Sequence, residues 1–327
     1  MFAPDSIAIS ENALFHSLLN PCRVACHLIR IGHEPLPPHT SNTFLHLIGL
    51  IRCPLAFYPN AFTYSFYLLK KYGYWRVITC GFFSSFCLEA THKTMTFMIN
   101  RYFVQRQLDS LEWMDDEDVL SNDQSTLLMN LIGKSSRREF FHLVRYILIA
   151  RAYELFVTQP FFVIMMRQIA SLVSGEDQYS WFFQAVVSIY RESGLMGFFS
   201  GLVPRMLWEL SRLGMYFLIY SLINRDGVDV PRHLSNNFKF LFNLLADVVV
   251  NVAAYPLQVV GSVMALHGSR IAIHEVGLAN SFGSWRECLQ FLISQGAQYR
   301  GYLPFWRRAP PSALTCHPIS HSTPSAA

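Results

Sequence analysis

Five long apolar segments run along the chain, and charged side chains interrupt most of them. Each is close to the ~20 residues that a helix needs to cross a bilayer. They cover roughly residues 11–31, 77–99, 140–169, 202–224 and 238–267. Within the fourth segment Arg205, Glu209 and Arg212 are spaced four and three apart, which puts all three charges on one helical face. The pattern predicts an all-α membrane protein whose helices carry charge.

Between the long segments one order of parts recurs three times: a helix ending near a proline, a short amphipathic helix, and a glycine turn. The prolines are Pro21, Pro160 and Pro256. Each short helix carries three apolar residues at one spacing, which predicts one buried face: Phe62, Phe66 and Leu69; Phe182, Val186 and Ile189; Trp285, Leu289 and Leu292. The turn glycines include Gly194, Gly197, Gly201 and Gly301. We therefore expect a threefold repeat.

The repeat divides the chain into five predicted parts. Residues 1–106 form the first repeat, 107–135 an acidic linker, 136–230 the second repeat, 231–308 an incomplete third repeat, and 309–327 a disordered tail. The linker is interpreted as a solvated loop, with an acidic strip for a partner as the alternative. The tail is rich in Pro, Ser and Ala, which is typical of disorder.

Composition agrees with a membrane class and excludes several functions. The chain of 327 residues is 52% hydrophobic and 15% charged, whereas soluble domains average about 25% charged residues. A net charge of +4 without a Lys/Arg block makes nucleic acid an unexpected partner. The seven cysteines lack zinc-ligand spacing. With no nucleophile triad and no phosphate-binding loop, we expect neither an enzyme nor a metal or cofactor.

The repeat resembles the mitochondrial carrier superfamily. Its glycine turn, two glycines three apart followed by two aromatic residues and a third glycine, is intact at Gly194, Gly197, Phe198, Phe199 and Gly201. The family's acidic and basic gate positions, two and five places after each proline, are lost. They hold Arg23 and Cys26, Phe162 and Met165, and Gln258 and Gly261.

Four stretches are similar to the mitochondrial carrier homolog family, a degenerate branch of that superfamily: "RIGHEPLPP" (30–38), "ARAYELFVTQPF" (150–161), "YRESGLMGFFSGLVPRML" (190–207) and "YPLQVVGSVMAL" (255–266). The resemblance implies a multi-pass protein of the mitochondrial outer membrane. It also implies an insertase for α-helical, tail-anchored proteins and a docking partner for truncated Bid.

The resemblance also implies a sixth helix after Gly301, which the sequence does not supply. Pro310 and Pro311 cannot continue a helix, and no apolar run of bilayer length follows. About five transmembrane helices would leave the bundle open on one side, next to membrane lipids. We therefore expect a hydrated lateral groove that admits client segments.

Six charged residues are candidates for lining this groove, because a charge at the bilayer centre costs about 2.5–3.5 kcal/mol: Arg151, Glu154, Arg205, Glu209, Arg212 and Asp247. Alternatives remain for most of them. Arg205 and Glu209 are also consistent with a pair at the membrane boundary, and Arg151 and Glu154 with a self-contained pair. Asp247 is expected to be functional or paired across helices. The competing functions are a small-solute exchanger and a non-catalytic membrane scaffold.

Overall fold

A computed structural model describes residues 20–41, 55–108, 137–225, 236–269, 271, 282–303, 305 and 307–309. Most of these residues are helical. All but the first two residues of the predicted acidic linker, and all but the first residue of the predicted tail, lie outside the described parts. The helices are α2 (Asn20–Ile31), α4 (Ala61–Tyr72), α5 (Tyr74–Thr79), α6 (Phe82–Leu108), α9 (Arg137–Ser174), η1 (Asp177–Tyr179), α10 (Phe182–Ser193), η2 (Leu195–Phe199), α11 (Leu202–Arg225), α12 (Asn236–Met264) and α13 (Trp285–Ser294).

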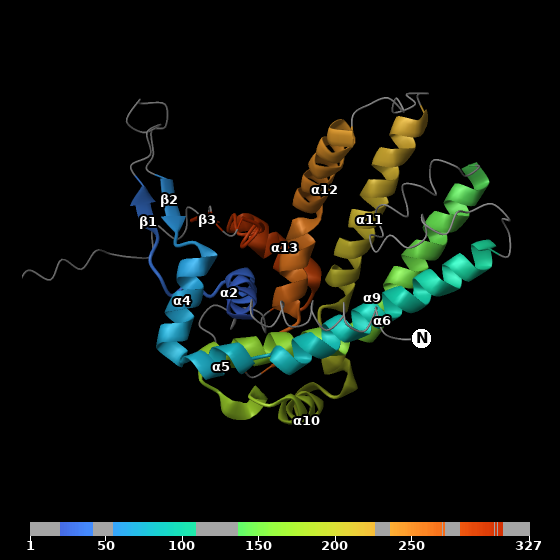
Figure 1. Cartoon of the computed structure of the whole chain (residues 1–327). Helices are drawn as coiled ribbons and strands as arrows, with labels where there is room; N and C mark the ends of the chain where they lie inside the picture. Colours follow the sequence, from blue (N-terminus) through green and yellow to red (C-terminus); the bar gives the residue numbers. More distant parts are fainter. Residues whose placement is uncertain are drawn as a thin grey trace, which may run out of the picture.

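The long helices lie where the apolar segments predict them, and each packs against the next. Helix α6 packs along α9, α9 contacts α11, and α11 packs along α12 (Figure 1). Two described stretches are long and apolar enough to cross a membrane, Val144–Ser174 within α9 and Leu244–Met264 within α12. Helix α2 has only 12 described residues, or about 18 Å at 1.5 Å per residue. The threefold repeat and the count of five spans stay predictions.

The three prolines do not end their helices, so that prediction is wrong. Pro160 lies inside α9 and Pro256 inside α12, while Pro21 is the second described residue of α2. A proline removes one hydrogen bond of a helix, but packing on the following turn holds these helices together. Met166 and Val259 are fully buried beyond Pro160 and Pro256. A proline in the first turn of a helix lacks an N–H that has no partner there anyway.

Two of the three short amphipathic helices bury the predicted face, and α4 does not. Ile189 of α10 and Leu292 of α13 are buried, and their predicted companions pack half-buried on the same core. On α4, Phe62 is 47% and Phe66 68% exposed. Instead Tyr64 lies on the buried face of α4. The hydroxyl of Tyr64 lies 2.6 Å from Nδ1 of His33. Aromatic and aliphatic residues surround α4 almost completely, so spacing alone does not select the face.

The glycine turns form where predicted, and Gly201 makes the closest approach. Gly194 and Gly201 have positive φ angles of 63° and 72°, a region that residues with a Cβ rarely adopt. A Cβ at Gly201 would lie 2.7 Å from the carbonyl oxygen of Gly261 in α12. A Cβ at Gly197 would lie 2.7 Å from Cβ of Ser193. The Gly201 turn therefore lets the start of α11 lie directly against α12.

The segment after Gly301 is not helical over its described residues. Gly301 itself also has a positive φ, of 72°. Its strand β3 (Arg307–Arg308) pairs antiparallel with β2 (Leu55–Tyr58), which pairs antiparallel with β1 (His39–Ser41). The sequence did not predict this small sheet (Figure 1). Buried Arg307 forms an ion pair with Glu34 and donates to the carbonyl oxygen of Pro59 at 2.7 Å. Pro310 and Pro311 lie outside the described residues.

We expect Gly201→Ala to destabilise the protein more than Gly194→Ala. Both changes place alanine at a positive φ, a backbone conformation that costs about 1–3 kcal/mol. Only Gly201→Ala adds a clash with the α12 backbone, because a Cβ at Gly194 meets nothing within 4 Å. Overpacking of this kind adds about 1–3 kcal/mol. Thermal unfolding of both variants in detergent measures the difference. Equal midpoints would show that α11 and α12 move apart to admit the added methyl group without a cost in stability.

Candidate functional site

Helices α6, α9 and α11 bring five polar or charged side chains into one chain of contacts, which we term the charge ladder: His92, Glu154, Arg151, Glu209 and Arg212. Arg151 of α9 donates to Glu154 at 2.7 Å and reaches Glu209 of α11 at 3.5 Å. Arg212 donates to the other oxygen of Glu209 at 2.9 Å. His92 of α6 contacts Glu154. The predicted face of α11 thus joins α9 and, through α9, α6.

The two carboxylates of the charge ladder are almost fully buried. Glu154 is 2% and Glu209 6% exposed. A buried carboxylate is tolerated only when it is paired and hydrogen-bonded. Two arginines face these two glutamates, so their formal charges balance. The interpretation of Arg151 and Glu154 as a self-contained pair is incomplete, because Arg151 also reaches Glu209.

Arg205 lies one turn before Glu209 but turns toward α9. It donates to Gln159 Oε1 at 2.9 Å, and its guanidinium lies 4.5 Å from the ring centre of Phe162. Gln159 in turn donates to the carbonyl oxygen of Ser200 at 2.7 Å. Glu209 accepts from Arg151 and Arg212 instead. The geometry therefore favours contacts between helices over a pair within α11 at the membrane boundary.

Asp247 stands apart from the charge ladder. Its carboxylate accepts from Tyr216 of α11 and, at 2.8 Å, from Asn251 one turn further along α12. Asp247 is therefore paired across helices, as one of the two sequence interpretations expects. Its side chain is exposed among Val248 and Val249, which are also exposed. The structure places it on the outer surface of α12 and gives it no contact with Arg151 or Glu154 among the described interactions.

Two contributors were not among the predicted site residues. His92 interrupts an apolar segment, which is the signal that could have identified it. Gln159 is fully buried beside Pro160, and nothing in its sequence position distinguishes it from a lipid-facing amide. Both act by contacting residues of other helices, which a pattern within one helix does not reveal.

A second buried cluster joins α9 to α10. Arg167 is fully buried, donates to the carbonyl oxygen of His267 at 3.0 Å, and pairs with Glu192 at 3.4 Å. Glu192 also accepts from Tyr179. Burial and this hydrogen bond raise the pKa of Tyr179, so its hydroxyl stays protonated as the donor. The cluster fixes the short helices to the long ones.

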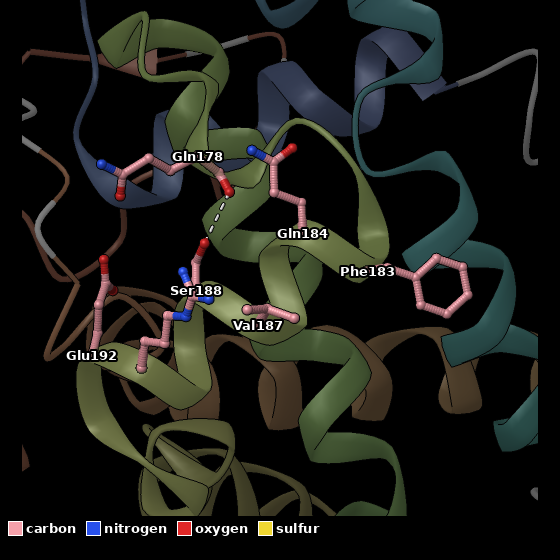
Figure 2. A pocket seen from close by; sticks show the side chains of 7 residues that line it. Gln178, Phe183, Gln184, Val187, Ser188 and Glu192 are labelled. Carbon is pink, nitrogen blue, oxygen red and sulfur yellow. Dashed lines mark hydrogen bonds between the residues drawn. The ribbon is translucent and has the colours of Figure 1, made fainter.

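A hollow on the outer side of α10 does not include the charge ladder. Its volume is about 640 Å³. Figure 2 shows Ser188 donating to the carbonyl oxygen of Gln178, at 3.1 Å, while Phe183 points away from these two residues. A much smaller cavity, of about 40 Å³, lies where α2, α9, α11 and α12 meet. A groove open to lipid stays a prediction.

Comparison with known proteins gives a consistent result. The family model described as mitochondrial carrier protein matches residues 138–226, which cover α9 to α11. Mitochondrial carrier homolog 2 of Mus musculus is 25% identical over 292 residues, covering 89% of this chain and 90% of the relative. The Homo sapiens protein of the same name is 25% identical, covering 88% and 89%. Mitochondrial carrier homolog 1 of Mus musculus is 24% identical, covering 93% and 77%.

We expect Glu209→Gln to lower the thermal midpoint clearly, because it leaves Arg151 and Arg212 without their shared carboxylate. Removing one partner of a buried pair costs about 3–5 kcal/mol. Asp177→Asn is the matched control, because Asp177 pairs with Arg76 at 2.8 Å but both side chains are more than half exposed. Exposed pairs contribute about 0–1 kcal/mol. If both variants unfold at the same temperature in detergent, the charge ladder does not hold the helices together.

Proposed function

Because this chain is a member of the mitochondrial carrier homolog family, we propose that it inserts α-helical, tail-anchored proteins into the mitochondrial outer membrane. The observation that carries the proposal is the charge ladder, a set of paired charges buried among long apolar helices. The relatives are named as homologs of mitochondrial carriers. Two described stretches of this chain are long and apolar enough to cross a membrane. No covalent step is required for this function.

The outward side chains of the long helices support a lipid environment. Large apolar residues are exposed on every one of them: Phe97 and Met98 on α6, Ile149 and Phe156 on α9, Leu218 on α11, and Leu245 and Val249 on α12. Exposed apolar surface of this extent is unfavourable in water and marks contact with membrane or partners. The exposed faces of α4 and α5 add Phe66 and Trp75, and aromatic residues are typical of the membrane interface.

The charge ladder would lower the barrier for a polar client segment. Such a segment crosses ~30 Å of hydrocarbon, where each unpaired polar group costs several kcal/mol. Side chains already held in place, such as Arg151 and Glu209, offer hydrogen-bonding partners without first having to reorganise. The ends of the ladder are its most exposed side chains, with His92 39% and Arg212 27% exposed, so a client reaches the ladder at these ends first.

The shape of the C-terminal segment supports a sideways exit. The described residues after Gly301 leave the long helices and join the small sheet as β3. Thus the segment that would begin a sixth helix does not cover the bundle over its described length. A client helix that leaves through this side transfers its apolar surface into lipid, which the hydrophobic effect favours.

Insertion of a tail-anchored reporter into liposomes containing the purified protein tests the proposal. The double variant Arg151→Leu/Glu209→Leu removes one charge of each sign from the ladder, and we expect insertion to slow by about tenfold if one contact worth roughly 1.4 kcal/mol is lost from the barrier. Arg76→Leu/Asp177→Leu removes an exposed pair of the same charges and should insert normally. Equal rates for the two double variants, at matched amounts of folded protein, would refute a role for the ladder.

A solute exchanger is the competing function, and the gate positions argue against it. Two of the positions where carriers place basic residues hold Met165, which is buried in the core, and Gly261, at which an added Cβ would lie 3.4 Å from the backbone nitrogen of Arg205. Neither supplies a charge for a gate. We expect no saturable exchange of nucleotides, carboxylates or amino acids in liposomes. Counter-exchange of any such solute that saturates would favour the exchanger.

A further inference from the structure

The small cavity where α2, α9, α11 and α12 meet, which we term the central cavity, is lined by two cations. Its volume is about 40 Å³, and its lining residues are Arg30, Phe162, Arg205, Trp208, Gln258, Gly261 and Ser262. No carboxylate belongs to this lining. A space lined by two arginines therefore lacks a negative charge of its own.

Buried hydrogen-bond donors at the central cavity lack acceptors. Arg30 Nε and Trp208 Nε1 are both buried without a hydrogen-bond partner among the described residues. Leaving a buried donor unsatisfied costs its full desolvation penalty. The ring of Phe162 and the amide of Gln159 occupy one side of the Arg205 guanidinium. Thus α2 and α11 each bring a residue with an unpartnered buried donor to the lining of this cavity.

The charges around the central cavity do not cancel the two arginines. The nearest acidic side chain to Arg205 on its own helix is Glu209, and both oxygens of that carboxylate accept from Arg151 and Arg212. On the opposite side, Arg30 lies beside the hydroxyl of Tyr255, which donates to the carbonyl oxygen of Arg300. The neighbouring groups leave room for one negative charge.

We propose that the central cavity binds a carboxylate group. A cavity needs about 10–15 Å³ to hold one water, so this cavity of about 40 Å³ takes only a small group. A carboxylate is such a group, and its two oxygens match the forked donors of arginine. The indole N–H of Trp208 supplies a further neutral donor.

Two sources can present this group: a free small carboxylate, or the terminal carboxylate of a polypeptide. The second source rests on the proposed insertase function. A tail-anchored client carries its C-terminus across the membrane, and a terminal carboxylate is costly to desolvate. The central cavity would hold it between Arg30 and Arg205 part of the way across.

Thermal unfolding of the full chain in detergent with sodium formate tests the binding. Formate should raise Tm by a few degrees with saturable dependence on concentration, because a ligand that binds the folded state stabilises it. Formamide has the same shape without charge, and chloride is an anion without paired oxygens, so neither should reproduce the shift at matched ionic strength. Equal shifts with formate and chloride would overturn the proposal.

Variants then assign the effect to the central cavity. Arg205→Gln should abolish the formate shift, and Arg205→Lys should retain part of it. Trp208→Phe removes the unpaired N–H and should weaken formate binding severalfold, whereas Trp75→Phe changes a tryptophan that is 81% exposed and should leave the shift intact. Trp208→Phe keeps an aromatic ring in the fold and guards against loss of structure. An unchanged shift in both Arg205→Gln and Trp208→Phe would place formate elsewhere.

A last comparison separates the two sources. Peptides ending in a free carboxylate or in an amide should be added to the protein in detergent in place of formate. A shift with the free carboxylate alone assigns the site to polypeptide termini, and no shift with either peptide assigns it to small carboxylates. Equal shifts with both peptides would contradict recognition of their terminal carboxylate. Insertion that stays normal in Arg205→Gln while its formate shift is lost separates the two conclusions, because it retains the insertase and removes the terminus-binding step.

Discussion

The requirement that buried carboxylates be paired governs how the long helices fit together. Glu154 and Glu209 lie in α9 and α11, and each is almost fully buried. An unpaired charge there would cost more than most single contacts contribute. Arg151 satisfies both carboxylates at once, so the rotation and height of α9 relative to α11 are fixed together. Helix α6 follows, because His92 completes the partners of Glu154.

Backbone approach is the second constraint, and it acts at the other end of α11. The turn at Gly201 lies against the backbone of α12 near Gly261. The buried Arg167 fixes α10 and the residues after α12 to α9. Close packing at one end and paired charges further along α11 define one arrangement of α9, α11 and α12. The central cavity lies between these two regions, where neither constraint fills the space.

The sequence predicted the helices better than the contacts between their side chains. Apolar length placed the long helices, and four-then-three spacing put Glu209 and Arg212 on one face, because both properties belong to a single helix. The partners were missed since they come from other helices: Gln159 for Arg205, and His92 for Glu154. The buried face of α4 was predicted wrongly because Phe62, Phe66 and Tyr64 are all apolar enough to be buried. Strands of two to four residues show no alternation from which to predict them.

The pairing of β3 with β2 joins the two ends of the described chain. Arg307 bonds to Pro59 across 248 positions and to Glu34 across 273. Contacts this distant in sequence form late, because the intervening chain must first be brought together. During synthesis the N-terminal residues emerge long before the strand that completes their sheet. The paired strands β1 and β2 must therefore wait, with one strand edge unpaired, until Arg307, 248 positions after Pro59, has left the ribosome.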